Sequence, residues 1–407
     1  MFVSVRNRLV ATVAGLSTTY WLLWVGTLVN RLGGFLAPFL SLYLTGERKI
    51  PIARAAFVVS LFGAGSFVGR IAGGELSDRV GRRPVLLLSF FATPAIVVAV
   101  GLVRPLSLLA AGTFLLGFFT DLYRPAVSAA IADIVPADKR IRAFGYLYWA
   151  VNLGAAIAPA VGGFMARENY FLLFAGDAVT TLLFGFIILF RFHETQPQSI
   201  RAEAAAKRIV APRHRLTLLA RDPALLLFAG LTFLFGLVYA QSGSTLPIAM
   251  GIHGVGPAGY GIVISLNGLL IVFLGISASR RAERWPRFPS IAVANVLLGA
   301  GFGLTMFAHA LPLYALSVVI WTVGEIVNAS VAPAVVADLA TPDVQGLYQG
   351  IYGSAWGLAF FAGPALGGWV LSEFGGPVLW AGCLVIGIGA AGGYLLLGRK
   401  MDRPPTN

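Results

Sequence analysis

An internal repeat constrains the fold of this chain more than any other feature. Residues 121–163 read DLYRPAVSAAIADIVPADKRIRAFGYLYWAVNLGAAIAPAVGG, and residues 326–368 read IVNASVAPAVVADLATPDVQGLYQGIYGSAWGLAFFAGPALGG. Without a gap, Asp133 aligns with Asp338, Pro159 with Pro364 and Gly163 with Gly368. Two apolar, Gly-rich copies about half a chain apart are typical of a membrane protein built from two parallel repeats.

Composition supports a membrane protein. Apolar residues make up 57% of the chain and charged residues 12%, against roughly 25% charged in ordinary soluble domains. The mean hydropathy is +0.82. The net charge of +13 lies in short loops between apolar runs, which favours a role in topology, and nucleic-acid binding is not expected. The single cysteine rules out an internal disulfide or thiolate cluster, and the four histidines show no HExxH spacing, so no metal is expected.

The chain contains twelve apolar runs of membrane-spanning length, which predicts an all-α membrane protein with both termini on one side. The first run carries Asn30 and Arg31 and is followed by further spans, so it is expected to be retained rather than cleaved. The runs lie near residues 18–44, 52–76, 84–103, 106–133, 143–166, 170–191, 223–249, 257–279, 288–309, 311–337, 346–371 and 377–398.

Positive charges in the connections predict the orientation. The segments on the side of the termini hold 22 Lys and Arg residues, and the opposite loops hold five. Because cytoplasmic loops carry the excess of Lys and Arg, both termini are expected in the cytoplasm and the chain in the cell (inner) membrane.

The repeat divides the chain into two pseudo-symmetric six-helix halves. We expect an N-terminal half at 1–192, a cytoplasmic linker at 193–222, a C-terminal half at 223–400 and a cytoplasmic tail at 401–407. Within the linker, RAEAAAKRI is compatible with a short cationic surface helix on anionic lipid headgroups, or with a flexible tether.

The connection between the second and third runs carries a charged, Gly-rich motif, GGELSDRVGRRP at 73–84. Asp78 is placed at a helix end, where it can accept backbone N–H groups and pair with arginine, and Gly81 permits a tight turn. The motif resembles the G-x-L-x-D-R-x-G-R-[KR]-x signature of the major facilitator superfamily. The resemblance implies a twelve-span transporter whose gating residues are Gly74, Asp78, Arg79, Gly81 and Arg82.

The second repeat holds a decayed copy of this motif. At the equivalent positions, ASRRAERWPRFP, Glu283 stands for Asp78, Arg284 for Arg79, Pro286 for Gly81 and Arg287 for Arg82. The resemblance therefore extends over nearly the whole chain.

The fifth run has the spacing G-x8-G-x3-[GA]-P-x2-G-G, with Ala158 before the proline. This pattern is similar to the family's antiporter motif, which implies export in exchange for protons. The alternative is ordinary tight packing of small residues with a proline kink, since GPALGG recurs in the second half. The motif residues are Gly145, Gly154, Pro159, Gly162 and Gly163.

Charges inside apolar spans are costly and mark candidate functional sites. Asp121 and Arg124 are three residues apart on one helix face, and Arg31 lies in the first span. Asp121 is the first candidate for a proton-linked carboxylate, followed by Glu325 and then Asp177, with Arg31 and Arg124 as charge partners. The alternative for each is a fixed ion pair that only holds helices together.

Polar and aromatic residues within the spans are candidates for a substrate cavity, or for interfacial anchors and interhelical hydrogen bonds. In contrast to the drug-exporter pattern, the first span has no acid, which weakens the case for strongly cationic substrates. The candidate lining residues are Trp24, Asn30, Tyr123, Asn152, Tyr239, Gln241, Asn328 and Trp356.

No GxxxxGK[ST] sequence is present, so an ion gradient is the expected driving force, and titratable carboxylates favour protons over sodium. The prediction is a monomeric proton-coupled antiporter without a cofactor that exports amphipathic small molecules by alternating access. The alternatives are a carrier for a native metabolite, sugar or lipid, and a membrane sensor without transport. No catalytic constellation suggests an enzyme.

Overall fold

The computed structural model describes residues 15–196, 222–282, 284, 286–340 and 345–401, and the regular elements within these residues are helical. The proposed surface helix RAEAAAKRI and Glu283 lie outside the described residues. The first half contains α2 (Thr18–Leu32), α3 (Leu36–Leu42), η1 (Tyr43–Glu47), α4 (Ile52–Val80), α5 (Arg82–Leu102), α6 (Leu106–Ile134), η2 (Ala137–Lys139), α7 (Arg140–Glu168) and α8 (Phe171–Arg191). The second contains α11 (Pro223–Tyr239), η3 (Ala240–Gly243), α12 (Thr245–Ile252), α13 (Pro257–Ala282), α14 (Arg287–Leu304), η4 (Thr305–Phe307), α15 (Leu311–Leu339) and α16 (Gln345–Met401).

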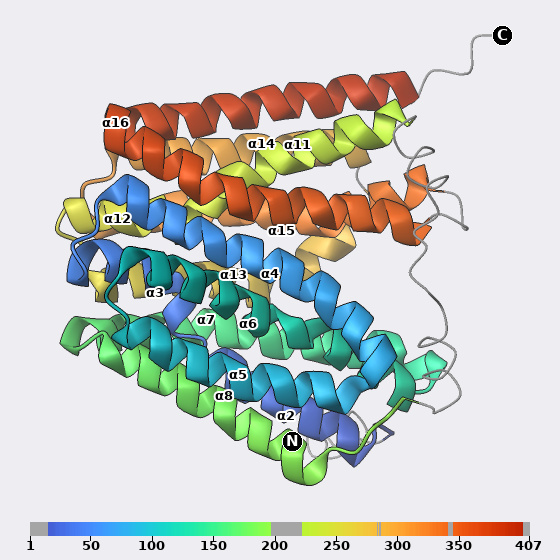
Figure 1. The fold of residues 1–407 in the computed structure, drawn as a ribbon. Helices are drawn as coiled ribbons and strands as arrows, with labels where there is room; N and C mark the ends of the chain where they lie inside the picture. The colour runs from blue at the N-terminus through green and yellow to red at the C-terminus, as the bar shows by residue number, and fades with distance from the viewer. Residues whose placement is uncertain (1–14, 197–221, 283, 285, 341–344, 402–407) are drawn as a thin grey trace, which may run out of the picture.

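Eleven of the described helical segments are long and apolar enough to cross a membrane. The last segment, Tyr348–Met401, contains two helices joined at Gly375, whose φ of 82° lies in the region that favours glycine. The two helices of α16 lie antiparallel to each other in Figure 1. The junction falls between the two runs predicted at 346–371 and 377–398.

The first predicted run is a broken helix rather than a continuous one. Helix α2 ends at Leu32, and α3 begins at Leu36. A side chain on Gly33 would collide with Thr180 of α8, so the break lies where the backbone packs tightly against α8. Hydropathy does not predict this break, because the whole segment Thr18–Glu47 is apolar enough to cross a membrane.

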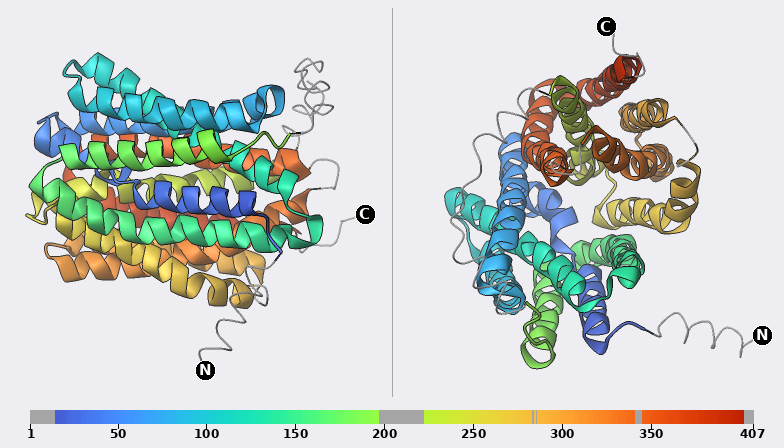
Figure 2. Two further views of the ribbon diagram at one scale, coloured as in Figure 1. Left: turned by 90° about the horizontal axis from the view of Figure 1, so that it is seen from below. Right: turned by 90° about the vertical axis from the view of Figure 1, so that its right-hand side faces the viewer.

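The helices form two groups that meet along two pairs, α4 with α16 and α7 with α13 (Figures 1 and 2). Small residues allow the close approach. A Cβ on Gly63 of α4 would lie 2.3 Å from the carbonyl oxygen of Phe360, and one on Gly268 of α13 would lie 2.5 Å from the Cα of Ala156. Large apolar side chains such as Phe190 and Phe273 project outward, as expected for a lipid-facing surface.

The two ends of the bundle differ. We call the end with the α4–α5 junction at Gly81 the linker end, because Phe192–Gln196 lie there, and the other the distal end. At the distal end the halves touch: the Ser41 hydroxyl donates to the carbonyl of Gly243 at 3.4 Å, and the rings of Phe39 and Tyr260 are 5.4 Å apart.

Toward the linker end the halves separate. A Cβ added to Gly145 of α7, or to Gly350 or Gly353 of α16, would meet no atom within 4 Å. Tyr148 of α7 is 59% exposed. The space between the halves is therefore closed at the distal end and accessible from the linker end.

Candidate functional site

Two adjoining cavities lie between the halves, of about 440 Å³ and about 320 Å³. Ser66, Arg70, Tyr239 and Phe360 line both, so the two cavities adjoin along these residues. Helices of both halves contribute to the lining, as expected for a site at the interface of two repeats.

Asp121 is the centre of an ion-pair cluster in the larger cavity. Its Oδ2 lies 2.7 Å from Nη2 of Arg70, and its Oδ1 lies 2.5 Å from Nε of Arg124. Oδ2 also accepts hydrogen bonds from the Ser66 hydroxyl and from Nε of Arg70, the latter at 2.9 Å. The predicted pair of Asp121 and Arg124 is present. Arg70 was a recognisable charge inside a span, but nothing in the sequence shows that Ser66 and Arg70, one helical turn apart on α4, face Asp121.

Arg31 lines the same cavity without joining this cluster. Among the described residues it forms no ion pair, and its guanidinium carbon lies 6.0 Å from the centre of the Tyr123 ring. Its neighbour Asn30 accepts a hydrogen bond from the Tyr123 hydroxyl at 3.3 Å and donates to Thr181 at 3.1 Å. The expectation that Arg31 pairs with Asp121 is wrong for this conformation, because Arg70 and Arg124 already hold that carboxylate.

Asp177 of α8 also lines the larger cavity. Its Oδ2 accepts a hydrogen bond from the backbone N–H of Leu36 at 3.2 Å, and the Thr181 hydroxyl lies 3.5 Å from Oδ1. The carboxylate thus sits at the start of α3, directly after the break at Gly33, where free backbone N–H groups are available.

Glu325 of α15 lines the smaller cavity and is held by neutral donors. The Tyr239 hydroxyl donates to Oε1 at 2.8 Å, and the Asn267 amide donates to Oε2 at 2.6 Å. No Lys or Arg of the described residues forms an ion pair with it. Of the three predicted carboxylates, Glu325 and Asp177 therefore lie in the cavities without a cationic partner, and Asp121 has two.

Five of the eight predicted lining residues line the cavities: Asn30, Tyr123, Tyr239, Asn328 and Trp356. The other three do not. Trp24 donates to the carbonyl of Tyr146 at 2.9 Å, Asn152 donates to the carbonyl of Tyr148 at 2.8 Å, and Gln241 donates to the carbonyl of Gly363 at 3.0 Å. Their side chains bind backbone carbonyls instead. Which residue of a helix faces the cavity depends on how the helix is rotated about its axis, and hydropathy does not predict that rotation.

The predicted antiporter motif lies at helix contacts on both sides of α7. Gly154 packs against Arg31 of α2, and Gly163 against Pro257 and Gly261 of α13 in the other half. Gly162 approaches Phe39, and Pro159 lines the larger cavity, whereas a Cβ added to Gly145 would have no neighbour within 4 Å. These glycines therefore pack against neighbouring helices, as the packing interpretation predicts, except at Gly145.

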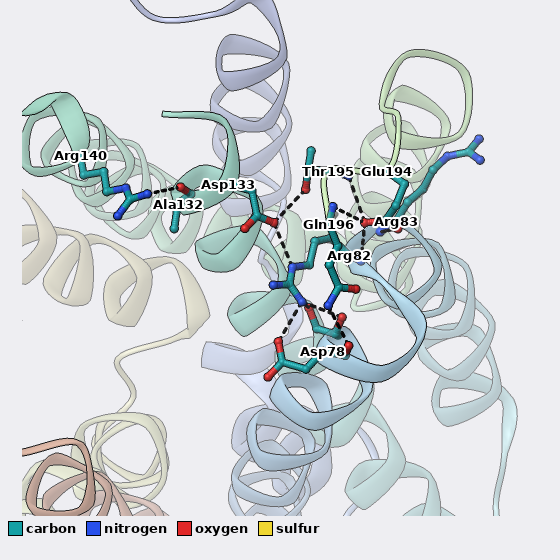
Figure 3. A network of polar contacts seen from close by, with 10 residues as sticks. Asp78, Arg82, Arg83, Ala132, Asp133, Arg140, Glu194, Thr195 and Gln196 are labelled. Carbon is teal, nitrogen blue, oxygen red and sulfur yellow. Dashed lines mark hydrogen bonds and ion pairs between the residues drawn. The ribbon is translucent and has the colours of Figure 1, made fainter. Parts of the chain in front are cut away.

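The predicted gating motif forms a polar network at the linker end (Figure 3). Arg82 is buried and binds Asp78 at 2.8 Å and Asp133 of α6 at 3.1 Å. Arg79 instead pairs with Glu75 at 2.9 Å, and Gly81, with a φ of 105°, makes the turn between α4 and α5. Gly74 faces Pro125 of α6.

The backbone N–H groups of this network bind Glu194 rather than Asp78. Asp78 lies at the C-terminal end of α4, where carbonyl groups and not N–H groups are free. The expectation that its carboxylate accepts backbone N–H groups is therefore wrong. Glu194 accepts from the backbone N–H groups of Arg82, Arg83, Thr195 and Gln196 at 3.0–3.1 Å. Partial burial raises the pKa of the Glu194 carboxyl, but these hydrogen bonds outweigh that effect and hold its pKa below the ordinary value.

The second repeat reproduces part of this network. Arg287 forms an ion pair with Asp338, and these residues are the repeat equivalents of Arg82 and Asp133. Here the arginine side chain is 44% exposed, against 8% for Arg82. The decayed copy keeps the contact between helices without the buried network.

Comparisons with known proteins agree with this architecture. Over 361 residues the chain is 25% identical to the uncharacterized MFS-type transporter YqjV of Bacillus subtilis (strain 168), covering 87% of each protein. It is 22% identical to a Na(+), Li(+), K(+)/H(+) antiporter of Planococcus maritimus, covering 85% of this chain and 84% of the relative. It is 27% identical to the quinolone resistance protein NorA of Staphylococcus aureus (strain Mu50 / ATCC 700699), over only 34% of this chain and 35% of NorA.

The fold also matches a solved structure, a POT family transporter in complex with a thioalcohol conjugated peptide. The TM-score is 0.79 at 16% identity, and the match covers 94% of this chain and 96% of the other. Residues 23–327 and 231–407 match the sequence profile described as Major Facilitator Superfamily. The chain therefore belongs to the Major Facilitator Superfamily of transporters.

Proposed function

We propose that this chain is a proton-coupled antiporter that exports amphipathic small molecules by alternating access across the cell (inner) membrane. The observation that carries the proposal is the cavity between the halves. It combines apolar and aromatic walls with half-buried carboxyl groups that form no ion pair with any described residue. The names of two relatives, a cation/H(+) antiporter and a quinolone resistance protein, support exchange for protons and export.

The geometry favours Glu325 over Asp121 as the proton carrier. Protonating Asp121 would break its ion pairs with Arg70 and Arg124. Protonating Glu325 breaks none, since its partners Tyr239 and Asn267 are neutral, and it removes a charge that is costly within a membrane. Asp177 shares this property and remains a second candidate.

The same proposal gives the orientation of the chain in the membrane and the conformational state of the structure. With the basic linker end in the cytoplasm, the chain has both termini inside and twelve spans, counting α16 as two. The structure then corresponds to a cavity open to the cytoplasm and closed outside, ready to receive a molecule for export. The buried Arg82 network would act as the latch that must open and close during the cycle, with protons and lipids as the remaining partners and the monomer as the working unit.

Flux in proteoliposomes with an imposed pH gradient tests the proposal. Wild type should accumulate an amphipathic probe against its gradient only when the proton gradient is present. Glu325→Gln should abolish that dependence while still binding the probe, because a neutral amide cannot exchange a proton. Glu168→Gln at the exposed end of α7 is the matched control and should transport like wild type. Gradient-driven accumulation that survives in Glu325→Gln, Asp121→Asn and Asp177→Asn alike would contradict proton exchange at these sites.

A further inference from the structure

We propose that the cavity takes organic anions with an apolar body, and that Arg31 binds their acidic group. This inference rests on the proposed function, because it names the substrate class of the same cavity. The distribution of charge along the cavity walls supports this substrate class. Arg31, Arg70 and Arg124, from α2, α4 and α6, bring three guanidinium groups to the first-half wall of the larger cavity.

The three arginines are not equivalent. Arg70 and Arg124 share the carboxylate of Asp121, so their charges are largely compensated. Arg31 forms no ion pair with any described residue, and its Nε is buried without a hydrogen-bond partner. An arginine inside a membrane protein either pairs or faces a water-filled cavity or pathway. Arg31 is therefore the free cationic group of this wall.

The surroundings hold Arg31 in place without neutralising it. Its base packs against Gly154 of α7 so closely that a Cβ there would lie 2.4 Å from the Arg31 Cβ. The nearby Asp177 accepts its hydrogen bonds from Leu36 and Thr181 and is not within ion-pair distance of Arg31. Gly154 thus holds the backbone and Cβ of Arg31 and makes no contact with its guanidinium group, and guanidinium matches the geometry of carboxylate, sulfonate and phosphate groups.

The second-half wall supplies the apolar complement. The rings of Tyr239 and Trp356 are 5.8 Å apart, and those of Trp356 and Phe360 are stacked at 5.9 Å. These residues line the cavities opposite the arginines. A molecule with an acidic group at one end and an aromatic or aliphatic body would contact both walls. A cation would face three guanidinium groups, against the carboxylates of Asp121, which two of those arginines hold, of Asp177 on the same wall, and of Glu325 on the second-half wall.

Three probes that share one naphthalene ring separate the charge classes: naphthalenesulfonate, naphthalenesulfonamide and naphthyltrimethylammonium. The sulfonate and the ammonium keep their charge at every working pH, so ion trapping by the pH gradient does not mimic transport. Binding to the purified full chain and flux in proteoliposomes are both measured. The variants are Arg31→Gln, Arg31→Lys and, as the control, Arg167→Gln, an exposed arginine outside the cavities.

Wild type should bind the sulfonate at least about tenfold more tightly than the sulfonamide, the effect of one charge-assisted hydrogen bond. Arg31→Gln should abolish this preference while leaving sulfonamide binding unchanged, which also shows that the variant is folded. Arg31→Lys should retain part of the preference, and Arg167→Gln all of it. A sulfonamide or ammonium bound as tightly as the sulfonate, an unchanged preference in Arg31→Gln, or no binding of any probe would overturn the inference.

Flux separates this inference from the proposed function. Arg31-dependent sulfonate binding without gradient-driven flux would leave the anion site standing and contradict the antiporter. Gradient-driven flux of the ammonium or the sulfonamide, with no flux of the sulfonate, would support the antiporter and overturn the anion site.

Discussion

At the scale of single residues, the pattern of ion pairing distinguishes the buried carboxylates. Asp121 is 4% exposed and is held by two arginines and a serine, whereas the partners of Glu325 among the described residues are neutral. From the sequence both are acids within apolar spans, and Asp121 next to Arg124 was the stronger candidate. The ion pair with Arg70 is the reason that we propose Glu325 instead. The position of Arg70 next to Asp121 could not be predicted, because spacing along one helix does not show which face of a neighbouring helix a residue meets.

The Asp121 cluster makes a stability prediction that a double variant can test. Asp121→Asn leaves Arg70 and Arg124 without their counter-charge and should lower the free energy of unfolding by about 1–3 kcal/mol, less than a fully buried pair because both arginines are partly exposed. Adding Arg124→Gln should recover part of this loss, since one unpaired charge is removed. Thermal unfolding in detergent measures both. Additive losses in the double variant would show that the residues do not interact.

At the scale of helices and their connections, the repeat was the most informative part of the sequence. It predicted the equivalence of the two halves, and the ion pairs Arg82–Asp133 and Arg287–Asp338 occupy equivalent places in them. It did not predict Glu194, because the chain between the halves has no counterpart in the repeat. Helix ends, in contrast, followed the expected runs closely, apart from two breaks. One lies at Gly33, where the backbone packs against Thr180, and the other at η3, which interrupts the run predicted at 223–249.

Glu194 makes the linker end sensitive to acid. Because its pKa is lowered in the folded protein, its contribution to stability is fully present above the unfolded pKa of about 4.3 and is lost as the pH falls through the folded value. Glu194→Gln should therefore lower thermal stability at neutral pH by about 1 kcal/mol, and the difference from wild type should vanish in acid. Unfolding midpoints from pH 7 downward measure this effect, with the exposed Glu168→Gln as the control. A difference that stays constant with pH would refute the role of the carboxylate charge.

At the scale of the whole molecule, the halves meet at the distal end and part at the linker end. Ser41 and Gly243 are in contact across the closed end, while Tyr148 is exposed at the open one. The sequence predicted two halves and their orientation, but not which end is open. That choice depends on contacts between helices far apart in the sequence, such as Gly163 against Pro257, which hydropathy and charge do not predict.

Cysteine labelling tests the direction of opening. In a Cys383→Ala background, Tyr148→Cys should react with a membrane-impermeant thiol reagent supplied from the cytoplasmic side, whereas Met250→Cys, at a buried distal position, should be protected from both sides. A substrate that drives the cycle should reduce the first reaction and increase the second. Labelling of Tyr148→Cys only from outside the cell would reverse the proposed orientation.

We propose that the transported molecule and protons cross the membrane in opposite directions in one linked cycle. The most direct measurement loads proteoliposomes with an amphipathic probe, imposes no pH gradient, and follows the internal pH with a trapped dye as the probe leaves. We predict that efflux of the probe acidifies the interior, and that Glu325→Gln eliminates this pH change. Efflux through the wild-type protein with no change in internal pH, or with alkalinisation, would contradict proton antiport.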